Sequence, residues 1–361
     1  MSHYEERLEE DLGKIRHRIA DMASDASLAL KNAVHALQTG DHPLASTTIL
    51  GDHAINRTMR EIDGMAHGFL AVHLPSGGHL RFLSSVIRAN ISFERIGDYA
   101  VTIARVSEQL SSPPSGGLGR ELERISSQAQ TMLRQSITAF NEQNAEMAKA
   151  TMVLEQEMEY DLDTIYAELT ENTEKERVRE LLAIFAVLTY LKRTADQAKN
   201  LCEDTVFAAT GETKAVKVYN ILFLDEDNSF LSQMAEAMAR KTFPGSGNYM
   251  SAGLTPAAAL NPEMERFMTE RGCDLSGARP KPIDLTHQEL TEKHVVVSLQ
   301  GPVTNYLPKL PFHTTAVEWD TGETPSAVDE SAADAGMEAT YRNIAVHVRD
   351  LMETLRGKGA N

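Results

Sequence analysis

Apolar residues in the first 110 positions recur every three or four residues, a spacing that lines one face of an α-helix. Comparable series run through residues 55–69 and 83–103. The pattern therefore predicts three helices before the first strong break in the chain. The members of the first series are Leu8, Leu12, Ile15, Ile19 and Met22.

That break is residues 111–117, which read Ser-Ser-Pro-Pro-Ser-Gly-Gly and combine two residue types that stop a helix. The helical pattern restarts at Leu122 and continues in three stretches as far as Cys202. We therefore expect two consecutive three-helix bundles, spanning residues 1–110 and 118–211.

The third helix of each predicted bundle carries a similar sequence. Residues 94–100 (Glu-Arg-Ile-Gly-Asp-Tyr-Ala) superpose without a gap on residues 192–198 (Lys-Arg-Thr-Ala-Asp-Gln-Ala), at a constant shift of 98 residues. Self-similarity of this kind is typical of a duplicated structural unit.

Beyond Gly211 the pattern changes to short β-rich runs that alternate with amphipathic segments, which is typical of a parallel sheet covered on both faces. We therefore expect a multidomain chain: all-α tandem bundles followed by a small α/β domain over residues 216–357. The predicted strands are residues 216–224, 249–253, 294–299 and 315–319, and the predicted helices are residues 234–243, 262–271, 284–293 and 337–355.

Composition narrows the possible functions. A formal net charge of -17 argues against nucleic-acid binding, because phosphate backbones require surplus Lys and Arg. The longest apolar run, residues 181–191, falls short of the roughly 20 residues of a membrane helix, so we expect a soluble, cytoplasmic protein. Cys202 and Cys273 show no CxxC spacing, so neither a disulfide framework nor a zinc knuckle is predicted, and we expect both to be buried as small hydrophobic residues.

Acidic and amide side chains recur at the four-residue spacing that stacks them on one helix face. Oxygen ligands of this kind suit hard cations. On spacing alone, however, the stronger interpretation is that these are solvated acids, or partners of Arg and Lys neighbours. The set is Glu94 with Asp98 and Asp52 with Asn56 in the first half, and Glu159, Asp163, Asp196, Asn200 and Glu203 in the second.

Residues 93–100 (Phe-Glu-Arg-Ile-Gly-Asp-Tyr-Ala) closely resemble the LERIGDHA signature of the PhoU family, and residues 191–200 look like its second copy. The resemblance covers residues 1 to about 211. It implies a regulator of phosphate uptake that binds clusters of iron, manganese or zinc. The implied partners are the phosphate transporter and a sensor kinase at the inner membrane surface, and the implied assembly is a homodimer. The implied ligands are Glu94, Asp98 and Asp52 at a first site, and Asp196, Asn200, Glu159 and Asp163 at a second.

The second copy departs from the family signature. Lys192 replaces the signature Glu and stands four residues from Asp196, where an ion pair can form. In the first copy, Thr102 replaces the family's Asn. We therefore expect the first site to bind metal more strongly than the second.

Residues 218–224 and 232–237 resemble the strand and helix that flank the active loop of low-molecular-weight tyrosine phosphatases and thioredoxin-coupled arsenate reductases. Those enzymes use a thiolate nucleophile and a loop-closing Arg. Asp225 stands in the nucleophile position and Leu231 in the Arg position, so we expect no catalysis and no phosphate binding. The degenerate loop is Asp225, Glu226, Asp227, Asn228, Ser229, Phe230 and Leu231.

Two functions from different classes follow. The first is a non-catalytic regulator of phosphate uptake and phosphate-starvation signalling that acts through metal-dependent protein contacts. The alternative is a phosphatase or arsenate-handling enzyme in which Asp225 acts as an aspartyl nucleophile, with a metal at Asp225 and Asp227 in place of the Arg. A third reading gives the acidic loop a purely structural cation, and Glu323 is expected to be a surface acid.

Overall fold

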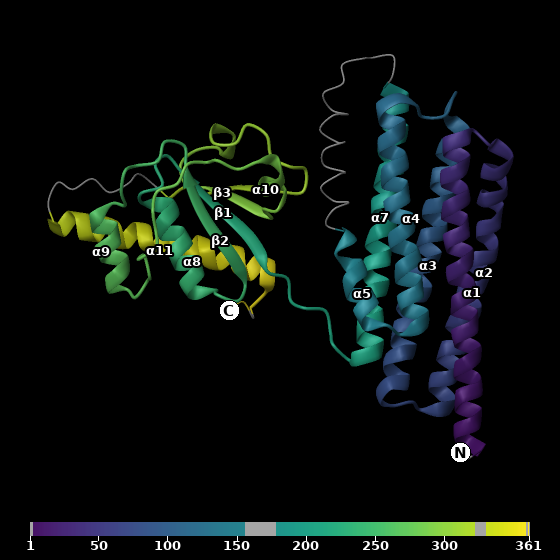
Figure 1. The fold of residues 1–361 in the computed structure, drawn as a ribbon. Helices are drawn as coiled ribbons and strands as arrows, with labels where there is room; N and C mark the ends of the chain where they lie inside the picture. The colour runs from purple at the N-terminus through teal and green to yellow at the C-terminus, as the bar shows by residue number, and fades with distance from the viewer. Residues whose placement is uncertain (1–2, 156–177, 322–329, 359, 361) are drawn as a thin grey trace. The chain divides into compact units, whose positions relative to one another are not determined.

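A computed structural model describes residues 3–155, 178–321, 330–358 and 360 (Figure 1). The chain divides into two compact units, Met1–Lys214 and Ala215–Asn361. Each unit has its own hydrophobic core and is described by itself. No helix among the described residues is long and apolar enough to cross a membrane.

The first unit is helical, as the hydrophobic pattern predicted. Its first three helices run antiparallel through short turns, and the 111–117 break separates them from the rest (Figure 1). Asp41 begins the second helix by accepting a hydrogen bond from the Leu44 N–H at 3.0 Å. The helices are α1 (His3–Thr39), α2 (His42–His73), α3 (Gly77–Gln109), α4 (Gly116–Glu142), α5 (Ala145–Met152) and α7 (Val178–Thr210).

One continuous core joins the two predicted halves, and α3 packs directly against α7. The rings of Tyr99 and Tyr190 lie 5.6 Å apart, while the Ser85 hydroxyl donates to the Asp204 carbonyl at 2.9 Å. Residue numbers thus rise along α3 as they fall along α7, and the helices are antiparallel. The two similar stretches, around residues 94–98 and 192–196, therefore face each other near the middle of this contact.

The second unit contains a four-stranded parallel sheet in the order β2-β1-β3-β4. The strands are β1 (Tyr219–Asp225), β2 (Gly247–Gly253), β3 (Val295–Ser298) and β4 (Thr315–Glu318). β1 begins three residues later than predicted, because Tyr219 is the first residue with a partner, Gly247, on β2. Val216 and Val218, which extended the predicted strand, are exposed.

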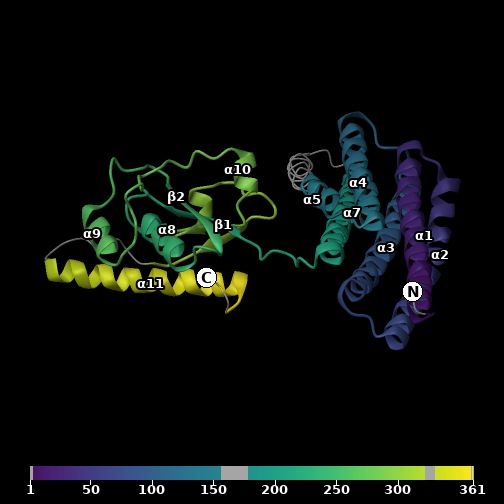
Figure 2. The ribbon, with the colours of Figure 1, turned by 60° about the horizontal axis from the view of Figure 1, so that its bottom comes forward.

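Helices cover both faces of this sheet, as the alternating pattern predicted (Figure 2). On one face, Ile221, Phe223 and Val297 pack with α8 (Leu231–Thr242), α9 (Pro262–Glu270) and α11 (Glu330–Arg356). On the other face, Leu222 and Val296 pack with α10 (His287–Thr291) and the segment around η2 (Val303–Asn305). The loop after β1 is thereby held between the sheet and the start of α8.

Candidate functional site

Helices α2 and α3 lie close together at Gly97. A Cβ atom on Gly97 would lie 2.8 Å from Asp52 Oδ1, closer than Cβ atoms approach other atoms in proteins, and a tight 3.2 Å from Ile55 Cδ1. Glu94 lies one turn before Gly97 on the same face of α3, and Asp98 follows Gly97 and stacks on Glu94 at four-residue spacing. The missing side chain therefore brings Asp52 into the neighbourhood of both acids, and we call Asp52, Glu94 and Asp98 the α2–α3 acidic site.

The three carboxylates of this site repel one another. Burial raises the pKa of Asp52, and the nearby Asp98 charge raises it further. Burial, Asp98 and Asp52, in that order, raise the pKa of Glu94. Asp52 Oδ2 accepts a 2.6 Å hydrogen bond from Asn56, while Asp52 Oδ1 is buried without a hydrogen-bond partner among the described residues. A cation would relieve both the repulsion and the unpaired oxygen.

The donors of the α2–α3 acidic site have not converged into a coordination sphere. Within the described ranges, no three His, Cys, Asp or Glu side chains stand close enough together to hold a metal ion. The Thr102 hydroxyl donates to the Asp98 carbonyl at 3.1 Å rather than turning toward the carboxylates. The charge distribution thus suits a cation, whereas the side-chain rotamers define no coordination geometry for it.

A cleft of ≈450 Å³ borders this site and reaches α7. Within the described part of the chain, neither Arg105 nor Arg193 has a carboxylate oxygen within salt-bridge distance, and the Arg193 guanidinium lies over the Tyr190 ring. Sequence reasoning missed this cleft because three separate helices contribute to it. Its lining residues are Ile49, Asp52, His53, Asp98, Tyr99, Val101, Thr102, Arg105, Tyr190 and Arg193.

The second copy of the motif, on α7, is arranged differently. Lys192 Nζ lies 3.2 Å from Asp196 Oδ1, which confirms the predicted ion pair. Lys199 pairs with Glu155 at 2.6 Å, and Lys214 pairs with Glu203 at 2.9 Å. Asp196 and Glu203 of α7, and Glu155 just after α5, are thus each paired with a lysine.

The remaining predicted second-site ligands do not join that group. Asn200 is exposed on α7. Glu159 and Asp163 lie outside the described residues. The structure therefore brings Asp52, Glu94 and Asp98 together, and places Asp196 beside a lysine instead.

In the second unit, the loop after β1 closes around its own aspartate. Asp225 is 1% exposed; its Oδ1 accepts the Asn228 N–H at 2.6 Å and its Oδ2 accepts the Ser232 N–H at 2.8 Å. Burial raises the pKa of Asp225, and the hydrogen bonds from Ser232 and Asn228 partly offset that rise. Both oxygens of the residue in the nucleophile position are therefore engaged.

Other loop N–H groups also find acceptors within the protein. The Glu226 N–H donates to Gln300 Oε1 at 3.1 Å, and the Ser229 N–H donates to Asp227 Oδ1 at 2.9 Å. Leu231, in place of the loop-closing Arg, is 1% exposed and packs in the hydrophobic core. The loop thus has neither a thiol nor a guanidinium of its own.

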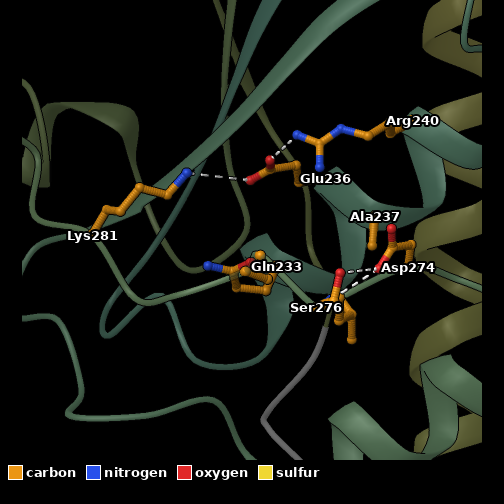
Figure 3. Close-up of a pocket in the computed structure, with 10 residues that line it drawn as sticks. Gln233, Glu236, Ala237, Arg240, Asp274, Ser276 and Lys281 are labelled. Carbon is orange, nitrogen blue, oxygen red and sulfur yellow. Dashed lines mark hydrogen bonds and ion pairs between the residues drawn. The ribbon is translucent and has the colours of Figure 1, made fainter.

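A polar cavity of ≈330 Å³ is lined by α8 and the segment of residues 274–281 (Figure 3). The buried Glu236 carboxylate accepts the Ser251 hydroxyl at 2.5 Å and pairs with Arg240, and the Lys281 ammonium is 4.0 Å away (Figure 3). Gln233 closes the cavity toward the loop by donating to Asn228 Oδ1 at 3.0 Å. The cavity wall is therefore internally charge-balanced and separated from the Asp225 carboxylate.

Both cysteines are buried, as the sequence predicted. Burial raises the pKa of the Cys202 thiol to about 12 and also raises that of Cys273. Neither thiol is therefore ionised to a useful extent at neutral pH, which is what a nucleophilic cysteine requires.

Comparisons with known proteins agree with this division into units. Residues 19–107 and 122–205 match the PhoU domain. A phosphate-specific transport system accessory protein PhoU homolog of Pseudomonas aeruginosa is 29% identical over 212 residues, 58% of this chain and 88% of that protein. The crystal structure of PhoU from the same organism superposes with a TM-score of 0.54 at 29% identity, covering 56% of this chain and 99% of that one.

Residues 220–360 match the low molecular weight phosphotyrosine protein phosphatase family. The structure of a thioredoxin-dependent arsenate reductase from Corynebacterium glutamicum superposes with 22% sequence identity and a TM-score of 0.32. The superposition covers 39% of this chain and 64% of that chain. The family match starts at Asn220, one residue into β1, and so includes the whole loop from Asp225 to Leu231.

Proposed function

We propose that this chain, which carries two PhoU domain matches followed by a low-molecular-weight-phosphatase-like domain, is a phosphate-transport accessory regulator without catalytic activity of its own. The observation that carries the proposal is the match of the helical unit to nearly the full length of phosphate-transport accessory proteins. In this role the chain works in the cytoplasm as a homodimer. It contacts the phosphate transporter and a sensor kinase at the inner membrane surface and adjusts phosphate-starvation signalling.

The α2–α3 acidic site is the proposed metal-dependent element of this regulator. Its support is electrostatic: three mutually repelling carboxylates, two of them with raised pKa values, and a buried Asp52 oxygen without a partner. Asp52, Glu94 and Asp98 would hold iron, manganese or zinc, which would neutralise their charge. The α7 copy would hold none, because Lys192 already supplies a positive charge at Asp196.

The proposed lack of catalysis rests on the loop after β1. An aspartyl nucleophile has to present a free carboxylate oxygen to its substrate. Asp225 is buried, and each of its oxygens accepts a backbone N–H. The alternative, an enzyme that uses Asp225, requires the loop to open, and it predicts aryl-phosphate turnover that disappears in Asp225→Asn.

Elemental analysis of protein purified without chelator tests the metal-dependent part. The parent is compared with a Glu94→Ala, Asp98→Ala double variant and with a matched control, Lys192→Ala, Asp196→Ala, at the corresponding positions of α7. We expect metal in the parent and the control, and its loss in the first variant. Equal metal loss in both variants would contradict a site on α3.

Expression of phosphate-responsive genes tests the regulatory role. We expect deletion of the chain, or the Glu94→Ala, Asp98→Ala change, to alter expression under phosphate sufficiency, while the α7 control has a smaller effect. Unchanged expression in the deletion strain would eliminate the regulatory role.

A further inference from the structure

The loop after β1 has the backbone arrangement of an anion-binding cradle. It connects the end of a parallel strand to the N-terminus of the 12-residue helix α8, where free N–H groups and the helix dipole favour negative charge. The family match assigns this loop to a phosphatase fold. What differs from an open cradle is the group inside it: the Asp225 side chain, which is 1% exposed.

The Asp225 carboxylate makes the contacts that a bound oxyanion would make. Its two oxygens accept one N–H group from the middle of the loop, Asn228 at 2.6 Å, and one from the first turn of α8, Ser232 at 2.8 Å. Charge-assisted hydrogen bonds of this length belong to the stronger class in proteins. A carboxyl group of the protein therefore already occupies the cradle.

The surrounding residues hold that carboxylate in place. Asn228, which has a φ of 52°, uses its side chain to donate to Ser232 Oγ at 2.7 Å and to accept from the Lys281 N–H at 2.8 Å. The end of β2 packs directly against the loop backbone at Gly253, because a Cβ atom there would lie only 2.6 Å from Asn228 N. The cradle thus keeps its shape without an external ligand.

We propose that Asp225 is a built-in occupant of an oxyanion cradle, an autoinhibitory contact that closes the α/β unit to phosphate and related tetrahedral oxyanions. The wild-type loop then binds neither phosphate nor sulfate. Replacing Asp225 by a small neutral residue leaves the N–H donors of Asn228 and Ser232 unpaired and available to an added oxyanion. Because the loop lies wholly within the α/β unit, this chemistry is independent of the role proposed for the helical unit.

Thermal unfolding of the full-length protein tests this by chemical rescue. Trp319, the one tryptophan of the chain, is 6% exposed in the core of the α/β unit, so its fluorescence reports on that unit alone. Without oxyanion, we expect Asp225→Ser to lower the Tm by about 5–10 °C, because two buried N–H groups lose their acceptor. Millimolar inorganic phosphate, and separately sulfate, should restore at least half of that loss along a saturable curve.

The matched control is Glu226→Gln, which removes the same charge from an exposed neighbour in the same loop. The wild type and Glu226→Gln should show no more stabilisation by phosphate than by potassium chloride of equal ionic strength. Phosphate rescue of Glu226→Gln equal to that of Asp225→Ser would mean that net charge alone matters, and would overturn the proposal. So would an Asp225→Ser protein that phosphate does not stabilise.

A second variant covers the case in which Asp225→Ser does not fold. Asp225→Asn keeps the size of the side chain and one oxygen acceptor, but turns an NH₂ group toward one of the two N–H donors. We expect a smaller loss of Tm than in Asp225→Ser and a partial, saturable rescue by phosphate. Absence of rescue in a folded Asp225→Asn protein with a lowered Tm would equally contradict the built-in occupant.

Discussion

The two motif helices of the helical unit, α3 and α7, share a sequence pattern and a contact but not an electrostatic state. On α3, burial and repulsion by Asp98 raise the pKa values of Glu94 and Asp52. On α7, the equivalent Asp196 has an ion pair with Lys192 at 3.2 Å. The acids on α3 would thus be stabilised by an added positive charge, whereas on α7 Lys192 already supplies one.

The α/β unit resembles α7 in this respect, except that the group supplied by the chain is an acid rather than a lysine. There, the Asp225 carboxylate takes the N–H donors that would otherwise favour an external anion. In both places the protein itself supplies the complementary group: Lys192 beside Asp196, and Asp225 beside two backbone N–H groups. Each unit thus meets one electrostatic requirement with a side chain of its own.

The largest effect we expect concerns an ion pair between α3 and α7. Arg88 of α3 binds Asp204 of α7 at 2.5 Å, and burial raises the pKa of Asp204 from 3.8 to about 6. The folded protein therefore keeps a proton that the unfolded chain releases between pH ~4 and ~6. The free energy of unfolding should fall by up to about 3 kcal/mol as the pH rises through this window.

Urea unfolding at several pH values measures this slope, with Asp204→Asn as the variant that removes it. The exposed aspartate Asp350 of α11 provides a matched control, because Asp350→Asn should leave the slope unchanged. A slope that persists in Asp204→Asn would place the titrating group elsewhere in the molecule.

The next effect concerns the close approach that sets α3 apart from α7. Gly97→Ala places a Cβ atom 2.8 Å from Asp52 Oδ1, so we expect a loss of about 1–2 kcal/mol in the free energy of unfolding. Gly64 of α2 has nothing within 4 Å of its Cβ position, so Gly64→Ala should instead gain up to about 1 kcal/mol from helix propensity. Urea unfolding distinguishes the two signs, and a gain in both variants would mean that Asp52 moves aside freely.

Sequence reasoning reached the helices, the sheet and the Lys192–Asp196 pair because each depends on local spacing. The predicted strand 294–299 agrees with β3 to within one residue at each end. A short run of valines is typical of a strand that is buried on both faces. It did not reach the contact of Gly97 with Asp52, or the cleft with Arg105 and Arg193. These depend on the packing of helices far apart in the chain, which periodicity does not encode.

The loop after β1 also contains a feature that the sequence did not predict. The sequence indicated that Asp225 and two further acids would repel phosphate, which treats the loop as a surface charge. The structure shows that Asp225 points inward, since its carboxylate accepts two loop N–H groups. The direction of a single side chain is not determined by residue type alone.

Restoring the signature on α7 would sharpen the comparison between the two copies. Lys192→Glu removes one ion pair with Asp196 and adds a like-charge contact at the same spacing, so we expect a loss of about 1 kcal/mol in the absence of metal. Manganese or zinc should stabilise Lys192→Glu more than Lys192→Gln, which has neither the positive charge of Lys nor the negative charge of Glu. Urea unfolding with and without metal measures the difference, and equal recovery in both variants would show that α7 gains no site.

The smallest expected effect is also the most direct contrast, because it makes the same change at equivalent positions. Burial and the Asp98 charge both raise the pKa values of Asp52 and Glu94, and Asp98→Asn removes the second cause, so metal-free protein should gain about 0.5–1 kcal/mol at neutral pH. Asp196→Asn removes the partner of Lys192 and should lose about 0.5 kcal/mol or less. Raised carboxyl pKa values mean that stability is lost as the pH rises through them, so the gain from Asp98→Asn should shrink in acid. Urea unfolding of metal-free protein at two pH values measures both changes. Effects of the same sign at the two positions would mean that the acids on α3 do not destabilise one another. The cation site was inferred from that repulsion and would then lose its support.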